Sequence, residues 1–308
     1  MVREELKVLI ENVEKVIVGK TETIKLLIVG LLTNGHILIE DVPGVGKTML
    51  SLALAKSISA DFKRIQFTPD LLPSDVTGGF IYSLKTGEFD FRKGPVFTNI
   101  LLADEINRTT PRTQSALLEC MQEYKVTADG KTFSLPAPFM VIATENPIEY
   151  QGTYILPEAQ IDRFLMKVNI GYLSSAQEVR VISEQKVTHP IETLKPVLGL
   201  EKILQLQQEV KNIQVSQNVL EYITNLVLAT RSLEVIKLGA SPRASIALMK
   251  ATSAWAMLEG RDYVIPDDVA NLLPYVLKHR LILQPKALIA GETADSVTAG
   301  LLKSTPIP

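Results

Sequence analysis

The sequence predicts an α/β protein in which helices cover both faces of a parallel β-sheet and a smaller all-helical domain follows. In the first two-thirds of the chain, short apolar runs alternate with helical patterns, as in sheets built from strand–helix–strand units. From about His189-Pro190 onward, helical periodicity replaces the strand pattern. A chain of 308 residues has room for about two domains. We therefore expect an α/β domain at residues 1–189 and a helical domain at residues 190–308.

The strand signals consist of apolar runs and hairpin patterns. Candidate buried strands lie at residues 36–40, 99–103 and 139–143. Polar residues follow each run, which suits a ligand site at the carboxyl ends of the strands. Two hairpins are predicted, with strands at residues 79–82 and 88–91 around Lys85-Thr86-Gly87, and at residues 125–127 and 131–133 around Ala128-Asp129-Gly130.

The second domain carries helical patterns at residues 200–213, 216–233 and 241–260. Ser241 is a suitable N-cap for the third helix, and Pro242 fits its first helical position. Residues 281–308 show few regularities, so their structure is left open.

Composition and charge argue against several classes of protein. The net charge of -2 produces no overall positive field that would attract nucleic acid or anionic lipid. The longest apolar run, residues 26–32, is far shorter than the roughly 20 residues that cross a bilayer. The single Cys120 cannot form an intramolecular disulfide, and three scattered histidines do not suggest a zinc site. We expect a cytoplasmic protein without a membrane span.

The strongest motif follows the first strand candidate. A glycine-bearing loop between a strand and a helix forms a nest of backbone N–H groups that binds phosphate. Gly44 and Gly46 allow close approach of phosphate oxygens, while Lys47 reaches the β- and γ-phosphates. The Thr48 hydroxyl is a candidate Mg²⁺ ligand. The full set of candidate loop residues is Pro43, Gly44, Val45, Gly46, Lys47, Thr48 and Met49.

One residue departs from the usual form of this loop. The general phosphate-loop pattern begins with glycine, whereas this chain has Asp41 at that position. Aspartate tolerates unusual backbone angles better than most residues, so the turn remains possible.

Two adjacent carboxylates and an amide follow the next strand candidates. Phosphoryl transfer needs a carboxylate near the metal and a group that activates the attacking water. We assign Asp104 to the metal and Glu105 to the water. Asn146 is the candidate that orients water against the γ-phosphate, although a turn residue before Pro147 is the alternative.

Two arginines complete the candidate catalytic set. Arg163 can act as a finger on the nucleotide of a neighbouring subunit, and Arg243 can contact the γ-phosphate within its own subunit. Either arginine can instead pair with a nearby acid, as isolated arginines usually do.

Together these segments resemble AAA+ ATPases, and the amino-acid sequences of the motifs resemble those of the MoxR family. The resemblance covers nearly the whole chain. It is carried by EDVPGVGKT at residues 40–48, ADEINR at 103–108, TQSALLE at 113–119, ATENP at 143–147, LPEAQIDRF at 156–164 and GASPRA at 239–244.

The resemblance implies an α/β nucleotide-binding domain with a small helical lid, and ATP with Mg²⁺ bound at their junction. It also implies Walker A and Walker B motifs and rings, commonly hexamers, in which Arg163 completes the adjacent site. Asn146 and Arg243 match the two nucleotide-sensing positions, and Val18 and Gly19 match the segment near the adenine. The two hairpins resemble insertions that project from the core. Such proteins act like chaperones on partner complexes, often beside a protein with a von Willebrand factor A domain.

Three functions therefore remain open. The first is an ATP-hydrolysing remodeller of protein complexes. The second is a motor that handles DNA or RNA, which the mild acidity disfavours but the hairpin residues Lys85, Arg92 and Lys93 keep possible. The third is a nucleotide-gated binding module in which hydrolysis is incidental.

Overall fold

The computed structural model describes residues 3–85, 87–147, 154, 156–184 and 189–308; Thr86, in the turn predicted for the first hairpin, lies outside them. Within the described residues, five parallel strands form one sheet in the order β2-β5-β8-β1-β9. Their bounds are β1 Ile37–Glu40, β2 Phe62–Gln66, β5 Ile100–Asp104, β8 Met140–Glu145 and β9 Met166–Val168. The expected parallel sheet is confirmed.

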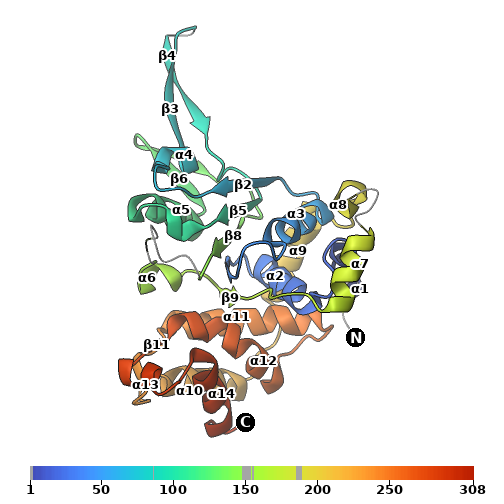
Figure 1. Ribbon diagram of the computed structural model, residues 1–308, viewed down its shortest axis with the longest axis vertical. Helices are drawn as coiled ribbons and strands as arrows, with labels where there is room; N and C mark the ends of the chain where they lie inside the picture. Colours follow the sequence, from blue (N-terminus) through green and yellow to red (C-terminus); the bar gives the residue numbers. More distant parts are fainter. Residues whose placement is uncertain (1–2, 86, 148–153, 155, 185–188) are drawn as a thin grey trace.

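Alternate strand residues face opposite sides of the sheet, and each side is covered by helices (Figure 1). On one side, Ile37, Ile39 and Ile100 join a cluster with helices α1 (Glu4–Glu14), α2 (Thr21–Leu32) and α3 (Lys47–Ser57). On the other side, Leu38 and Leu101 pack with α5 (Pro111–Glu123). Burial on both faces explains why the central strands are continuous apolar runs.

Both predicted hairpins are present, and they pack against each other. The first consists of β3 (Gly78–Ser83) and β4 (Glu88–Lys93), and the second of β6 (Lys125–Ala128) and β7 (Lys131–Ser134). Phe91 and Phe133 stack with ring centroids 4.0 Å apart, and Phe80 lies against both rings. Beyond this contact the first hairpin projects alone from the molecule (Figure 1).

The remaining elements connect the sheet to the second region. They are α4 (Pro73–Thr77), α6 (Glu158–Ile161), α7 (Ser175–Glu184), α8 (Pro190–Thr193) and α9 (Leu200–Val210). A short 3-10 helix, η1 (Ile106–Arg108), follows β5, and another, η2 (Lys278–Arg280), follows α12.

The C-terminal helices pack beneath the sheet region in the view of Figure 1. They are α10 (Gln217–Ala229), α11 (Pro242–Leu258), α12 (Pro266–Leu277), α13 (Pro285–Ile289) and α14 (Ala294–Ser304). As expected, Ser241 caps α11: its hydroxyl accepts the Arg243 N–H at 3.2 Å. The expectation of an all-helical region was incomplete, because β10 (Ile236–Leu238) and β11 (Ile282–Leu283) pair as a short antiparallel ribbon. These strands are too short to produce a period in the sequence.

Among the described residues, the helices lack the length and apolar character that a bilayer crossing requires.

Candidate active site

The loop after β1 has the backbone geometry of a phosphate cradle. Gly44 and Gly46 have φ angles of 87° and 90°, in the left-handed region that favours glycine. A Cβ added at either glycine would meet nothing within 4 Å, so the loop backbone is open to an incoming group. Gly46 is the N-cap of α3, and the positive end of that helix therefore faces the loop.

The Lys47 ammonium group lies across this loop. It donates to the carbonyl of Asp41 and, at 3.5 Å, to the carbonyl of Glu145. Burial lowers the pKa of Lys47, while the surrounding carboxylates, Asp41 first among them, oppose that shift. Thr48 and Met49 follow in the first turn of α3 and are half-buried. A triphosphate would replace the two carbonyl partners with charged ones.

Asp104 ends β5 at the same edge of the sheet. Its Oδ2 accepts from Arg64 Nη2 at 2.6 Å, and its Oδ1 accepts from the Thr144 hydroxyl at 2.6 Å. These contacts fix the carboxylate at the strand end, where a cation beside the Thr48 hydroxyl would find oxygen ligands of the kind that Mg²⁺ prefers.

Glu105 has a strained backbone and a fixed side chain. Its φ of 57° and ψ of 52° are uncommon for a residue with a Cβ. Its N–H donates to the Thr144 hydroxyl at 2.8 Å, and its Oε2 accepts from Gln66 Nε2 at 2.5 Å. Arg108 lies 3.1 Å from the same oxygen. Strain of this kind is maintained where the surroundings over-determine the conformation, as at functional sites.

Three of these contacting residues were not among the residues singled out from the sequence. Arg64 and Gln66 lie on β2, an edge strand whose charged residues hide its period, and Thr144 stands inside the quoted ATENP segment without an assigned role. Pairing of β2 with β5 brings Gln66 opposite Asp104. The signal for Thr144 was its place at the end of a buried strand beside the acidic pair.

Asn146 follows β8 directly and is 5% exposed. Its neighbour Glu145 is opposite Glu40 in the sheet register. Burial raises the pKa of Glu145 to about 7; Lys167 opposes this shift, and Glu40 adds to it. Lys167 itself pairs with Glu40 at 2.5 Å.

Val18 and Gly19 lie at the end of the α1–α2 connection. Val18 is buried and Gly19, with φ of 70°, is exposed. The side chain of Gln177, from α7, lies on the side of Gly19 where a Cβ would be, so that an added Cβ would lie 1.9 Å from Gln177 Nε2.

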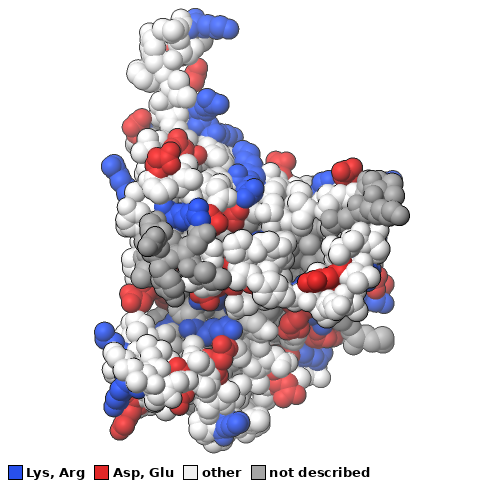
Figure 2. Space-filling model, viewed as in Figure 1, with Lys and Arg blue, Asp and Glu red and all other residues white. Residues whose placement is uncertain are grey.

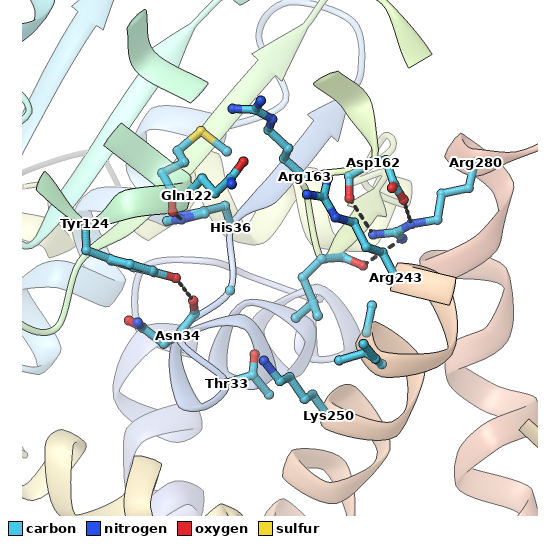
Figure 3. A pocket seen from close by; sticks show the side chains of 15 residues that line it. Thr33, Asn34, His36, Gln122, Tyr124, Asp162, Arg163, Arg243, Lys250 and Arg280 are labelled. Atoms are coloured by element: carbon cyan, nitrogen blue, oxygen red, sulfur yellow. Dashed lines mark hydrogen bonds and ion pairs between the residues drawn. The ribbon is translucent and has the colours of Figure 1, made fainter. Parts of the chain in front are cut away.

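The two candidate arginines lie in a separate cavity of about 240 Å³ (Figure 3). Arg163 donates to the Leu118 carbonyl at 2.9 Å, and its buried Nε has no hydrogen-bond partner among the described residues. Arg243 lies beside the Asp162–Arg280 ion pair, and Lys250 enters from the other side (Figure 3). Asp162, the acid next to Arg163 in the chain, pairs with Arg280, and no ion pair of Arg163 or Arg243 is found among the described residues.

This cavity lies at the amino ends of the parallel strands, and the phosphate loop lies at their carboxyl ends. Arg163 precedes β9, whose first residue Met166 is in register with Ile37, the first residue of β1. The cavity is also lined by residues 33–36, which lead into β1, whereas the phosphate loop follows the other end of that strand. Because α11 packs at the amino ends of the strands, Arg243 lies away from the phosphate loop of its own subunit. Its contact with a γ-phosphate stays a prediction, and this placement favours the nucleotide of another subunit.

The donor groups at the phosphate-loop edge fit ATP with Mg²⁺. Two glycines with open left-handed backbones, a helix N-terminus and a lysine suit a polyphosphate. A hydroxyl and a strand-end carboxylate suit the metal.

Comparison with known proteins gives the family. Residues 36–166 match a family described as "ATPase family associated with various cellular activities (AAA)", and residues 228–299 match an AAA lid domain. Chaperone MoxR1 of Mycobacterium tuberculosis is 44% identical over 306 residues, which cover 96% of this chain and 81% of that protein. The chain belongs to the MoxR family of AAA+ ATPases.

Two other proteins are similar to this MoxR-family chain over nearly its whole length. Protein YeaC of Bacillus subtilis is 55% identical over 299 residues, which cover 97% of this chain and 93% of YeaC. A crystal structure of a proposed ATPase from Cytophaga hutchinsonii superimposes with a TM-score of 0.91 at 41% identity, covering 99% of this chain and 95% of that chain. The arrangement of sheet and lid described above is therefore shared with a solved structure.

Proposed function

We propose that this MoxR-family chain is a ring-forming ATPase whose catalytic sites are shared between adjacent subunits. One observation carries the proposal: the phosphate loop and the arginines Arg163 and Arg243 lie at opposite ends of the parallel strands. A copy placed head-to-tail brings its arginines to the phosphate loop of the next. A contact of this heterologous kind closes into a ring when its rotation permits. Six subunits are the number that the family resemblance favours.

In each shared site the phosphate loop and Lys47 bind the triphosphate, and the metal is held through Thr48 and Asp104. Bound MgATP supplies the phosphoryl group and a charge-neutralising cation. Glu105 activates the attacking water, and Asn146 orients it. The guanidinium groups of Arg163 and Arg243 stabilise charge that develops on the neighbour's γ-phosphate.

We further propose that hydrolysis remodels protein partners. One relative carries the name chaperone, and the projecting hairpin exposes apolar side chains, with Leu84 92% exposed and Phe89 66% exposed. Exposed apolar groups of this kind favour contact with protein rather than with water. The family resemblance also implies a partner protein with a von Willebrand factor A domain, and the sequence indicates a cytoplasmic location.

Steady-state ATPase activity measured against protein concentration, with assembly followed by light scattering, tests the shared site. We expect specific activity to rise with assembly. Arg163→Ala and Arg243→Ala should each lower turnover about 100-fold or more while assembly persists, because each removes a transition-state contact. Activity that is independent of concentration and insensitive to both arginines would support the nucleotide-gated module instead.

Mixing two inactive variants provides the matched control. Glu105→Gln is expected to bind ATP but hydrolyse it about 100- to 1,000-fold more slowly. The Glu105→Gln variant still supplies both arginines, and the Arg163→Ala variant still supplies the phosphate loop and Glu105. In a random equal mixture, about a quarter of the sites combine the two intact halves, so activity should reappear. A mixture that stays inactive would contradict sharing.

One observation favours the alternative function, a motor that handles DNA or RNA. Lys85, Arg92 and Lys93 are exposed on the projecting hairpin beside Tyr82 and Phe89, and basic groups gather along this hairpin and its base (Figure 2). Glu88 and Asp90 on the same hairpin offset part of this charge. Binding to single strands that weakens steeply with salt and stimulates ATP hydrolysis would favour this function.

A further inference from the structure

The aspartate that replaces the first glycine of the phosphate loop has a defined set of partners. Asp41 is 8% exposed. Its Oδ2 accepts the N–H groups of Ile170 and Gly171 at 2.7 and 2.6 Å, and its Oδ1 accepts the N–H of Val42 at 2.8 Å. Gly171 has φ of 68°, so two successive N–H groups converge on one oxygen, as in an anion-binding nest. A glycine at position 41 could make none of these side-chain contacts.

The segment that Asp41 holds is the connector between β9 and α7. Lys20 holds the same segment from its other side, donating to the carbonyls of Ile170 and Tyr172 at 2.7 and 2.8 Å. Asn169 adds a third link through a 2.6 Å hydrogen bond to the Glu40 carbonyl. The connector is therefore tied to the phosphate loop on one side and to the α1–α2 connection on the other.

Both ends of this connection lead to segments that are proposed to bind the nucleotide. Lys20 is the residue after Gly19, in the segment expected near the adenine. The connector leads into α7, whose Gln177 lies beside Gly19. The loop expected to bind the phosphates and the segment expected to lie near the base are thus hydrogen-bonded to the same residues, Ile170–Gly171–Tyr172, the first through Asp41 and the second through Lys20.

From these contacts we propose that Asp41 is a positioning residue that couples the base half of the nucleotide site to its phosphate half. The proposal rests on the function proposed above. The Asp41 carboxylate fixes the connector, the connector fixes Lys20 and Gln177 relative to Gly19, and the base therefore gains affinity only when the loop is in place. Asp41 makes no contact with the reacting atoms in this role.

The test compares Mg–ATP with inorganic Mg–tripolyphosphate, which lacks the base and ribose, by calorimetric titration. The ratio of the two affinities measures the contribution of the base half. Asp41→Asn keeps the size of the side chain but turns an amide N–H₂ toward backbone N–H groups. We expect it to lower the ratio about tenfold, as loss of hydrogen bonds to a charged group does. Lys20→Met should lower the same ratio, and the double variant should add little, because both act on the connector.

Lys63→Met is the matched control, since Lys63 also donates to a backbone carbonyl, that of Phe97 at 3.2 Å, but lies away from the connector. It should leave the ratio unchanged. A ratio that is unaltered in both Asp41→Asn and Lys20→Met, or additive losses in the double variant, would overturn the coupling. If Asp41→Asn does not fold, Lys20→Met alone decides in the same way. Failure of the wild-type protein to bind Mg–ATP would instead reject the proposed function.

Discussion

At the scale of single residues, Thr144 connects the two acidic side chains of the candidate site. Its hydroxyl accepts the Glu105 N–H and donates to Asp104 Oδ1, and the residue is fully buried. One hydroxyl therefore supports both the strained backbone of Glu105 and the orientation of Asp104. Neither carboxylate is held by its own strand alone.

We predict that Thr144→Val lowers kcat about 10- to 100-fold, because the variant keeps the shape of the side chain but removes hydrogen bonds to a carboxylate and to a strained N–H. Thr144→Ser should restore most of the activity. Steady-state kinetics on assembled protein provide the measurement. An activity loss in Thr144→Ser as large as that in Thr144→Val would contradict this role, because serine keeps the hydroxyl.

His36 predicts a pH dependence of stability. Its Nδ1 accepts the Val141 N–H at 3.0 Å, so the proton is on Nε2, which donates to the Met121 carbonyl at 2.9 Å. Burial lowers the pKa of His36 to about 4 from its usual 6.5. The unfolded chain therefore binds the proton more readily, and the folded state loses stability as the pH falls from about 6.5 toward about 4.

Between pH 7 and pH 5 we expect His36 to account for a loss of about 2 kcal/mol in the free energy of unfolding. Denaturant titrations at the two pH values measure it. The control is His36→Gln, which should lose that part of the pH dependence. Burial also lowers the pKa of His279, which adds a dependence of the same sign, and raises the pKa of Glu145 to about 7, which adds one of the opposite sign. The difference in pH dependence between the wild type and His36→Gln therefore measures the contribution of His36. An identical pH slope in both proteins would exclude His36.

At this scale the sequence was informative where chemistry is concentrated in a short motif. Gly44, Gly46 and Lys47 follow one another in the chain, so their pattern was visible. Gln66 and Glu105 come together only through the pairing of β2 with β5, and no local pattern records that pairing. The roles assigned to individual side chains stay predictions until the variants are measured.

At the scale of elements, the two hairpins depend on each other through a small aromatic cluster. Phe133 of the short hairpin stacks on Phe91 of the long one, and Phe80 lies beside both. Phe97 packs edge-on against Phe91 at 5.8 Å. An isolated two-stranded hairpin is marginally stable in water, so this cluster supports the projecting hairpin at its base.

We predict that Phe133→Ala increases amide hydrogen exchange across β3 and β4 about tenfold, since aromatic pairs contribute about 0.5–1.5 kcal/mol beyond the buried area. The parallel sheet should exchange as in the wild type. Phe89→Ala is the control, because Phe89 pairs with Tyr82 away from Phe133 and is largely exposed. Equal exchange changes in both variants would show that the cluster is not the support.

Buried apolar runs and hairpins with clear turn residues were predictable, whereas an exposed edge strand and a very short strand were not. The strands β1, β5 and β8 are buried on both faces and appeared as apolar runs. The edge strand β2 is mostly exposed, and β9 has three residues, so neither produced a pattern. The α13 and α14 helices lie in the region that was left open, because their apolar positions are few.

At the scale of the whole molecule, Arg280 joins the lid to the segment that carries Arg163. Its Nε donates to Asp162 Oδ1 at 2.7 Å, and its remaining N–H groups donate to backbone carbonyls, including that of Phe164 at 2.6 Å. Ser241 of the lid also donates to Asp162, at 3.0 Å. The side chain of Arg280 is 3% exposed, so little water competes for these contacts.

We predict that Arg280→Met destabilises the protein by about 3–5 kcal/mol, because it leaves a partly buried carboxylate and several carbonyls unpaired. Thermal unfolding measures the loss, and hydrogen exchange at residues 162–168 should rise. Arg261→Met is the matched control: its ion pair with Asp268, at 2.6 Å, lies within the lid. That variant should leave exchange at residues 162–168 unchanged. The opposite pattern would contradict a role for Arg280 between lid and core.

The position of the lid relative to the sheet was the feature that sequence could least predict. Both arginines were identified from short motifs, but whether Arg243 faces its own phosphate loop depends on the edge of the sheet on which α11 packs. That choice is made by apolar contacts spread over α2, α11 and α12, which form one cluster with the sheet. No residue near Arg243 encodes it.

The separation of phosphate loop and arginines by the length of β1, about 13 Å at about 3.3 Å per residue, also bears on inheritance. In the proposed ring, a subunit with a defective arginine keeps its own phosphate loop, but the catalytic site that its arginine should complete on the adjacent subunit no longer hydrolyses ATP. A cell that makes normal and Arg163-defective chains together would therefore assemble mixed rings in which healthy copies are inactivated by their neighbours. Such an allele behaves as dominant, whereas an allele that prevents folding, and so never enters a ring, is recessive.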